Sequence, residues 1–258
     1  MSRLKTLFKH RNSNILNIYI TAGFPALNDT ILIVQELEKA GVDIVEIGMP
    51  FSDPLADGPT IQASSQKAIE NGITLSKIFE QVTEIRKTVQ IPLILMGYFN
   101  QVLKFGVPQF FEKARETGID ALIIPDLPID VYKNEFASLV DEIDLDLIFL
   151  ITPQTSNERI KMIDKLSKGF LYQVSAHSTT GSQQDLQTSQ LEYFKRIKAM
   201  NLENPTMIGF GISNHDTFAA ACEYANGAII GSAFIDAVAN STDLPATIHQ
   251  FVKDILGR

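Results

Sequence analysis

The sequence is poor in cysteine and in histidine. Cys222 is the only cysteine among the 258 residues, which excludes an intramolecular disulfide and a cysteine-rich zinc site. It lies in the segment FAAACEY, which is typical of a packed helix face, so we expect a structural thiol. The four histidines have no spacing that would make a metal site, and we expect no bound metal.

Long apolar runs and excess positive charge are also absent. No stretch approaches the ~20 apolar residues that cross a membrane, and residues 1–14 contain no apolar run of the kind that forms a signal peptide. We therefore expect a cytoplasmic protein. Lysine and arginine total 22 against 30 acidic residues, a net charge of −8, which speaks against nucleic acid or an anionic membrane as the main partner. No dinucleotide fingerprint and no P-loop occur.

Short apolar runs alternate with longer helical patterns along the whole chain. The runs predict strands at 15–23, 43–50, 91–99, 120–126, 145–152, 170–176, 205–211 and 227–232. They are apolar on both faces, as parallel strands covered by helices must be. A doubly wound sheet uses the same alternation, but eight units in about 250 residues fit a closed barrel better. The sequence thus predicts an α/β protein, a single (β/α)8 TIM barrel domain over 1–258, with an N-terminal helix at 3–9 that covers one end.

Three acids lie where the second expected strand ends. Glu46 stands inside the apolar strand, and Asp53 and Asp57 follow in a loop rich in proline and glycine. Because such barrels carry their chemistry at the C-terminal ends of the strands, the three acids are expected to gather at the mouth. A structural alternative for Glu46 is an ion pair with a lysine or arginine of the barrel. For Asp53 we expect a loop-shaping role through hydrogen bonds to the backbone.

Two glycine-containing segments, GFGIS and GAIIGSA, lead from the last two expected strands into helical segments. Helix N-termini offer free N–H groups and a positive dipole end to an anion. The loops after the seventh and eighth strands commonly hold phosphate in this architecture. The candidate phosphate donors are Gly211, Gly231, Ser232 and, after the sixth strand, Gly181. The alternative is that these are ordinary turn glycines.

The segment VEIGMPFSDPLADG closely resembles the signature of the tryptophan synthase alpha chain family. Further segments occur in the order of that family: YITAGFP (19–25), MGYFNQV (96–102), IPDLP (124–128), TTG (179–181), GFGIS (209–213) and GSAF (231–234). The resemblance covers the whole chain. It implies an eight-stranded barrel, a lyase of L-tryptophan biosynthesis that cleaves indole-3-glycerol phosphate to indole and glyceraldehyde 3-phosphate.

The resemblance also implies a protein partner. Members of this family work beside a pyridoxal-phosphate beta chain that consumes the indole, which implies an α2β2 heterotetramer and no cofactor in this chain itself. The loops at the mouth are expected to expose the apolar surface that docks on the beta chain. The side chains expected to form this surface are Pro54, Leu55, Phe99, Val102, Leu103 and Leu127.

The functional positions of the family are carried over motif by motif. Glu46 matches the catalytic acid–base glutamate, Asp57 the second catalytic carboxylate, and Tyr172 the tyrosine beside the indole ring. The other implied substrate- or phosphate-binding residues are Thr180, Gly181, Phe210, Gly211, Gly231 and Ser232. The sequence departs from the family at Ser178, where many members carry glycine. The long polar loop over 176–190 is expected to close over the substrate.

The implied reaction gives both acids a task. Indole C3 must accept a proton, the side-chain hydroxyl must lose one, and the ring carries positive charge until the carbon–carbon bond breaks. A carboxyl group in an apolar strand is expected to have a raised pKa, which suits Glu46 as general acid and base. Asp57 lies in a loop, so we expect it to stay ionised and to stabilise the ring cation by accepting the indole N–H.

Two other functions are alternatives. One is another phosphate-binding barrel enzyme of the same pathway; a lysine on a strand would favour a synthase, but no expected strand core carries one. The other is a non-catalytic barrel that only activates a beta-chain partner. The presence of both Glu46 and Asp57 speaks against it.

Overall fold

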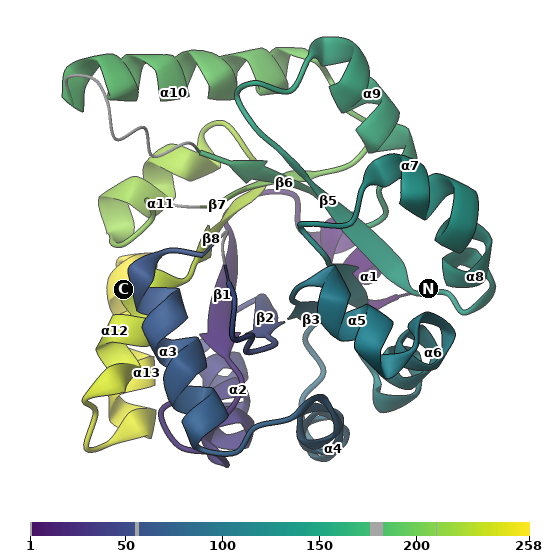
Figure 1. Cartoon of the computed structure of the whole chain (residues 1–258). Coiled ribbons are helices and arrows are strands. Elements are labelled where there is room, and N and C mark those ends of the chain that lie inside the picture. The colour runs from purple at the N-terminus through teal and green to yellow at the C-terminus, as the bar shows by residue number, and fades with distance from the viewer. Residues whose placement is uncertain (1, 55–56, 176–182, 210) are drawn as a thin grey trace.

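The computed structural model describes residues 2–54, 57–175, 183–209 and 211–258, without the side chains of 183–188. Parallel strands form a closed barrel in which each strand pairs with the next and β8 pairs with β1 (Figure 1). The strands are β1 (Ile15–Thr21), β2 (Ile44–Gly48), β3 (Leu93–Met96), β4 (Ala121–Ile123), β5 (Asp146–Ile151), β6 (Leu171–Val174), β7 (Thr206–Gly209) and β8 (Gly227–Ile230). The predicted (β/α)8 barrel is confirmed.

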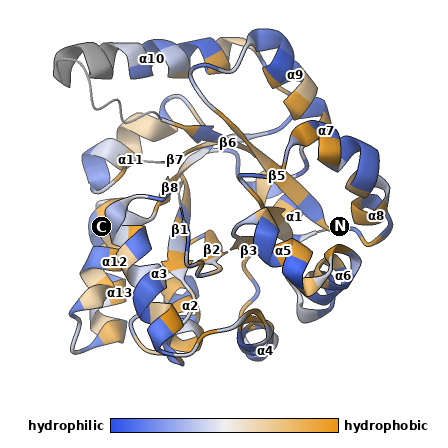
Figure 2. Cartoon of the chain, viewed as in Figure 1, coloured by the Kyte–Doolittle hydropathy of each residue, from blue (hydrophilic) through white to orange (hydrophobic). Residues whose placement is uncertain are grey.

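Helices surround this barrel on the outside (Figure 1). They are α2 (Asp29–Ala40), α3 (Pro59–Glu70), α4 (Leu75–Ile85), α5 (Phe99–Phe105), α6 (Val107–Thr117), α7 (Ile129–Val131), α8 (Ala137–Glu142), α9 (Asn157–Leu166), α10 (Gln183–Ala199), α11 (His215–Cys222), α12 (Ser232–Ala239) and α13 (Leu244–Leu256). Orange and blue residues alternate along their ribbons, as expected for helices with one face against the strands (Figure 2). No helix in the described ranges is long and apolar enough to span a membrane.

Several expected boundaries are wrong, and the fourth strand, for example, ends at Ile123 and not at residue 126. The third strand ends at Met96, because the chain turns at Gly97 and starts α5 at Phe99, where the backbone N–H of Tyr98 is capped by the Gln101 side chain at 3.1 Å. The expected loop over 176–190 is wrong for 183–190, which belong to α10. That stretch contains no glycine or proline to stop a helix.

Two apolar clusters form the core. The larger lies between the strands and the helices, and the smaller fills the inside of the barrel. Alternation along each strand decides the cluster that a residue joins. On β1, Leu16, Ile18 and Ile20 belong to the outer cluster and Ile15 to the inner one. Asn17 and Tyr19 therefore face the inside of the barrel.

The helix α1 (Arg3–His10) closes the end of the barrel where the strands begin. Leu4 is fully buried in the inner cluster, and the Phe8 ring packs on Phe170 with 6.1 Å between centroids. Lys5 Nζ lies 2.9 Å from the carboxylate of Asp146, the first residue of β5. In Figure 1 α1 is seen behind the strands. With this end closed, the other end of the barrel is left for a ligand.

Candidate active site

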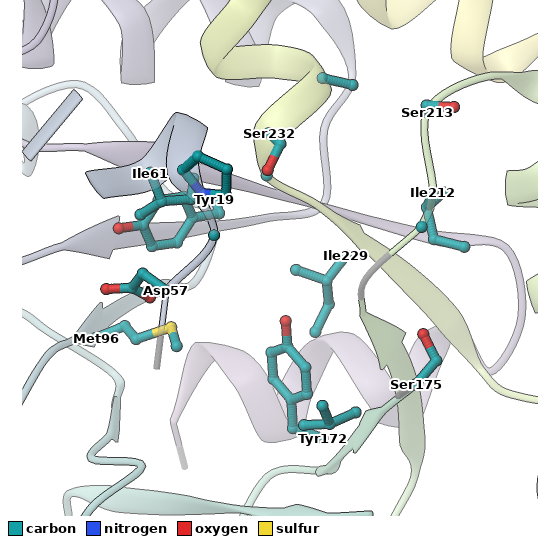
Figure 3. A pocket seen from close by; sticks show the side chains of 16 residues that line it. Tyr19, Asp57, Ile61, Met96, Tyr172, Ser175, Ile212, Ser213, Ile229 and Ser232 are labelled. Carbon is teal, nitrogen blue, oxygen red and sulfur yellow. The ribbon is translucent and has the colours of Figure 1, made fainter. Parts of the chain in front are cut away.

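A cavity of about 720 Å³ opens at the C-terminal ends of the strands. Its lining combines aromatic, aliphatic, carboxylate and hydroxyl groups. The lining residues are Tyr19, Asp57, Gly58, Pro59, Ile61, Met96, Tyr172, Val174, Ser175, Gly211, Ile212, Ser213, Ile229, Gly231, Ser232 and Ala233. In Figure 3 the Tyr172 hydroxyl points toward the space between Asp57, Tyr19 and Ser232. The volume is typical of a small-molecule site.

Glu46 lies on β2 and is completely buried, so it is not among the residues that line the cavity. Asn17 Nδ2 donates a hydrogen bond to Glu46 Oε1 at 2.5 Å, and Oε2 has no partner among the described residues. Burial raises the pKa of Glu46 to about 8, and the bond from Asn17 opposes that rise. No lysine or arginine in the described ranges forms an ion pair with Glu46, which removes support for the ion-paired alternative.

Asp57 is held at the cavity by contacts from three segments. Its backbone N–H donates to Pro54 O at 3.1 Å, and its carbonyl accepts from Gln62 Nε2 of α3 at 2.8 Å. The Tyr98 hydroxyl donates to Asp57 Oδ2 at 3.0 Å. Burial raises the pKa of Asp57, and the bond from Tyr98 lowers it. The carboxylate is therefore fixed in direction at the edge of the cavity.

Asp53 differs from Asp57 although both lie in the same loop. It is exposed, and its carboxylate accepts a hydrogen bond from the neighbouring Ser52 hydroxyl at 2.6 Å. It does not line the cavity. The bond joins two side chains, so the expected loop-shaping role through backbone hydrogen bonds stays a prediction.

Two tyrosine hydroxyls lie directly over glycines. A Cβ atom on Gly48 would lie 2.0 Å from the Tyr19 hydroxyl, and one on Gly209 would lie 2.2 Å from that of Tyr172. Burial raises the pKa of both tyrosines, and the charges of Asp57 and Glu46 raise it further. Both phenols therefore stay neutral over the physiological pH range and can donate hydrogen bonds.

The far end of the cavity is formed by the residues around two helix starts. Gly231 is the N-cap of α12, and Ser232 is its first residue. Gly211 adopts a left-handed φ of 77° before α11, a conformation that favours glycine. Free N–H groups at the start of α12 make this end suited to an anion.

Five of the expected site residues line this one cavity: Asp57, Tyr172, Gly211, Gly231 and Ser232. Glu46 lies buried within the barrel, near enough to Tyr172 and Tyr19 for its charge to raise the pKa of each. Thr180, Gly181 and Phe210 lie outside the described residues, as does Ser178. For these four positions the sequence-based expectations stay predictions.

A family model described as tryptophan synthase alpha chain matches residues 5–255. The chain belongs to the tryptophan synthase alpha chain family. The expected identity as a lyase of tryptophan biosynthesis is thereby confirmed.

Relatives within the tryptophan synthase alpha chain family cover nearly the full chain. The tryptophan synthase alpha chain of Flavobacterium psychrophilum is 56% identical over 244 residues, covering 95% of this chain and 96% of the relative. That of Flavobacterium johnsoniae is 55% identical over 244 residues, with the same coverage of 95% and 96%.

Solved structures of the tryptophan synthase alpha chain family share the fold. Tryptophan synthase subunit alpha from Legionella pneumophila has a TM-score of 0.89 and 31% identity, with 100% of this chain and 98% of that chain covered. A tryptophan synthase structure from M. tuberculosis in an aminoacrylate-bound form has a TM-score of 0.87 and 28% identity, with 99% and 98% covered.

Sequence reasoning missed two polar residues of the site, Asn17 and Tyr19 on β1. Asn17 carried a usable signal, because a polar side chain inside an otherwise apolar strand is the same pattern that marked Glu46. The sequence suggests Tyr98 as a core residue or part of the ligand wall, but not its bond to Asp57, which joins residues that are 41 positions apart.

The expected apolar docking surface is smaller than the sequence suggested. Val102 is fully buried and Leu127 is 5% exposed, so the expectation is wrong for both, because their side chains pack in the outer core cluster. Phe99 is half-buried, and its ring packs on that of Phe136 with 5.8 Å between the ring centroids. Leu103, on α5, is 52% exposed. Leu55 lies outside the described residues.

Proposed function

We propose that this chain cleaves indole-3-glycerol phosphate to indole and glyceraldehyde 3-phosphate, with Glu46 as general acid and base and Asp57 stabilising the indole ring cation. The observation that carries the proposal is the pair of unlike carboxyl environments at one cavity. Glu46 is completely buried and its pKa is raised to about 8, whereas Asp57 is only partly buried and lines the cavity, where the Tyr98 hydroxyl donates to its carboxylate. Such pairs divide proton transfer from charge stabilisation.

One carboxyl group can carry out both proton transfers of the reaction. Protonated Glu46 gives its proton to indole C3, and the ring becomes a cation with charge on nitrogen. The C3–carbon bond then breaks and its electron pair neutralises the ring, while the departing carbon forms the aldehyde. The hydroxyl proton of that carbon returns to the Glu46 carboxylate. Asp57 accepts the ring N–H while the charge exists.

The two ends of the cavity differ, and each suits one part of the substrate. Its apolar and aromatic lining, with Met96 and Tyr172, suits an indole ring. Its opposite end, with Gly231 and Ser232 at the start of α12, suits the phosphate. We propose Tyr172 as the residue beside the ring, and Gly211, Gly231 and Ser232 as phosphate contacts with Thr180, Gly181 and Phe210.

The deciding experiment supplies indole-3-glycerol phosphate to the isolated chain and measures indole release. Release that is first order in enzyme supports the proposal. Two alternatives predict no release: a non-catalytic barrel gives none with any substrate, and another phosphate-binding barrel enzyme of the pathway turns over a different substrate.

Gly231→Ala is expected to weaken glycerol 3-phosphate binding about 10-fold, because the new methyl group occupies the approach of the anion to the helix start. The fold should tolerate the change. A Cβ at this position would meet Tyr19 and Ile61 only at 3.6 Å or more, and φ is −115°. Gly211 is a poorer test because its left-handed φ makes any side chain strained.

Calorimetric titrations with glycerol 3-phosphate and with indole check the Gly231 prediction. Indole binding should be unchanged. Gly58→Ala is the matched control, because it adds a methyl group to the same cavity with no atom within 4 Å and should leave glycerol 3-phosphate binding intact. Equal losses for both ligands in Gly231→Ala would indicate a folding defect.

We also propose that the mouth of the barrel docks on a beta chain that carries pyridoxal phosphate, in an α2β2 assembly. This chain itself needs no cofactor, because the cleavage requires only the proton transfers and charge stabilisation described above. Leu103 supports a contact surface, since it is a large apolar side chain left 52% exposed on α5. The cytoplasmic location and the single domain over 1–258 stay predictions.

Leu103→Lys is expected to weaken beta-chain activation of indole release about 10-fold or more, because docking would bury the new charge. The basal rate of the isolated chain should not change. Ile69→Lys is the control, since Ile69 is a 36% exposed apolar residue near the end of α3 that is remote from the mouth. Titration of the cognate beta chain measures activation, and equal effects of the two variants would contradict docking at α5.

A further inference from the structure

We propose that Asn17 is a positioning residue for Glu46, whose side-chain amide holds one carboxyl oxygen and leaves the other free to exchange a proton with the substrate. The inference rests on the proposed function and deepens it. It assigns a role to a residue of β1 that does not line the cavity and has no counterpart among the motifs that identified the site.

The placement follows from the register of two neighbouring strands. Asn17 pairs with Ile44 and Tyr19 pairs with Glu46 across β1 and β2, so Asn17 and Glu46 are diagonal neighbours on the inner face of the barrel. Both side chains are completely buried. The contact is a side-chain hydrogen bond of 2.5 Å from Asn17 Nδ2 to Glu46 Oε1. Burial on all sides leaves the amide few other orientations.

The two oxygens of Glu46 differ in their surroundings. Oε1 is bonded to Asn17, whereas Oε2 is buried without a hydrogen-bond partner in the described part of the chain. A buried oxygen without a partner is costly and needs a physical reason, and proton exchange with a substrate supplies one here. The bond to Oε1 therefore fixes the direction in which Oε2 is presented.

An amide suits a group that changes its protonation state during each turnover. Its N–H donates to Oε1 of the carboxylate and also of the protonated acid, because an acid that carries its proton on Oε2 keeps an acceptor at Oε1. Asn17 Oδ1 has no partner among the described residues. The same side chain can thus accompany both forms of Glu46 without a second ionisable group.

The ionisable groups near Glu46 are Tyr19 on β1, Tyr172 on β6 and Asp57 in the loop after β2. Burial raises the pKa of both tyrosines above their ordinary range. Burial also raises the pKa of Asp57, against the bond from Tyr98. For Glu46 the hydrogen bond from Asn17 lowers the pKa that burial raises to about 8. Removing Asn17 should therefore raise it further.

A purely structural role for Asn17 makes a different prediction. If the amide only stabilised the barrel, its replacement by an apolar residue of similar size would lower stability and leave the pH dependence of the reaction unchanged. Asn17→Leu removes the buried, unpartnered Oδ1 but leaves Glu46 Oε1 without its donor, so the two effects oppose each other and we expect little net change in the melting temperature.

The test compares indole release by the wild-type chain and by Asn17→Leu as a function of pH. The wild-type kcat should fall as pH rises through about 8, because Glu46 must be protonated to donate to C3. In the variant kcat at neutral pH should fall about 10-fold or more with little change in KM, because the lost hydrogen bond orients the acid and stabilises the carboxylate that forms when the proton is given to C3. The pH at which kcat of the variant falls should be higher than in the wild type by about one pH unit.

Gln173→Leu is the matched control. Gln173 is a fully buried amide on β6 on the opposite strand face from Tyr172, so its replacement should leave the pH at which kcat falls unchanged. If Asn17→Leu does not fold, Asn17→Val removes the same donor with a smaller side chain that is favoured in strands. An unchanged pH for the fall of kcat in the folded variant, or an unchanged kcat, overturns the positioning role.

Infrared titration of the Glu46 carboxyl, assigned by difference from Glu46→Gln, separates this inference from the proposed function. The Glu46 signal should titrate at higher pH in Asn17→Leu than in the wild type. Absence of indole release by the wild-type chain would overturn the proposed function alone. An identical carboxyl titration in both proteins would overturn the role of Asn17 alone.

Discussion

Glu46→Gln is expected to lower the turnover of indole-3-glycerol phosphate by at least about 10²-fold, the lower range for a lost acid–base group. Glutamine keeps the shape of the side chain and can still bond to Asn17, but it cannot give a proton to C3 or take one from the hydroxyl. Substrate affinity should change little, because glutamine occupies the same space and the proton transfer it abolishes contributes only in the transition state. The loss should therefore fall on kcat.

The same substitution is expected to stabilise the fold at alkaline pH. The pKa of Glu46 rises from its ordinary value of 4.5 to about 8 on folding. Between these values the folded state holds a proton that the unfolded state has lost, so stability falls as pH rises across this window. Glutamine has no proton to lose. Above pH ~8 the variant should exceed the wild type by a few kcal/mol of unfolding free energy.

Opposite changes in activity and stability distinguish a catalytic group from a structural one. Single-turnover indole release measures activity, and denaturant unfolding at pH 5 and pH 9 measures stability. The stability difference should be small at the lower pH, where the carboxyl is protonated in the folded state. Near-normal indole release by Glu46→Gln would sink the catalytic assignment, whatever the unfolding data show.

The barrel and its reacting end could be predicted because they depend on local pattern. Apolar runs of the correct length mark each strand, and alternation with helical segments fixes the parallel order. Glu46 stood out because a charge inside an apolar strand needs a reason. Asn17 carries the same kind of signal more weakly, since an amide costs less to bury than a carboxylate. The direction of its bond required the register between β1 and β2.

Other features depend on contacts that no local pattern encodes. The burial of Val102 and Leu127 follows from the way α5 and the loop after β4 fold back on the outer core. In the sequence the same residues read as an exposed apolar surface. The space around Gly231 and the left-handed backbone of Gly211 likewise separate two glycines that the sequence presents as equivalent.

Asp57→Asn is expected to lower kcat by about 10²-fold, as found when one oriented electrostatic group at a developing charge is removed. Asparagine keeps the size of the side chain and its contact with Tyr98. It loses the negative charge that opposes the positive charge of the indole ring. Binding of indole alone should be almost unaffected, because ground-state indole is neutral and gains little from that carboxylate.

Asp53→Asn supplies the matched control in the same loop. Asp53 is exposed and bonds only to Ser52 among the contacts of its side chain that the described structure contains, so the isolated Asp53→Asn chain should release indole at the wild-type rate. Tyr98→Phe tests orientation, since it leaves the charge of Asp57 and removes the bond at 3.0 Å. Its kcat should lie between those of the wild type and Asp57→Asn. Equal losses for Asp57→Asn and Asp53→Asn would mean that loop charge in general matters, and that the fixed carboxylate beside the ring does not.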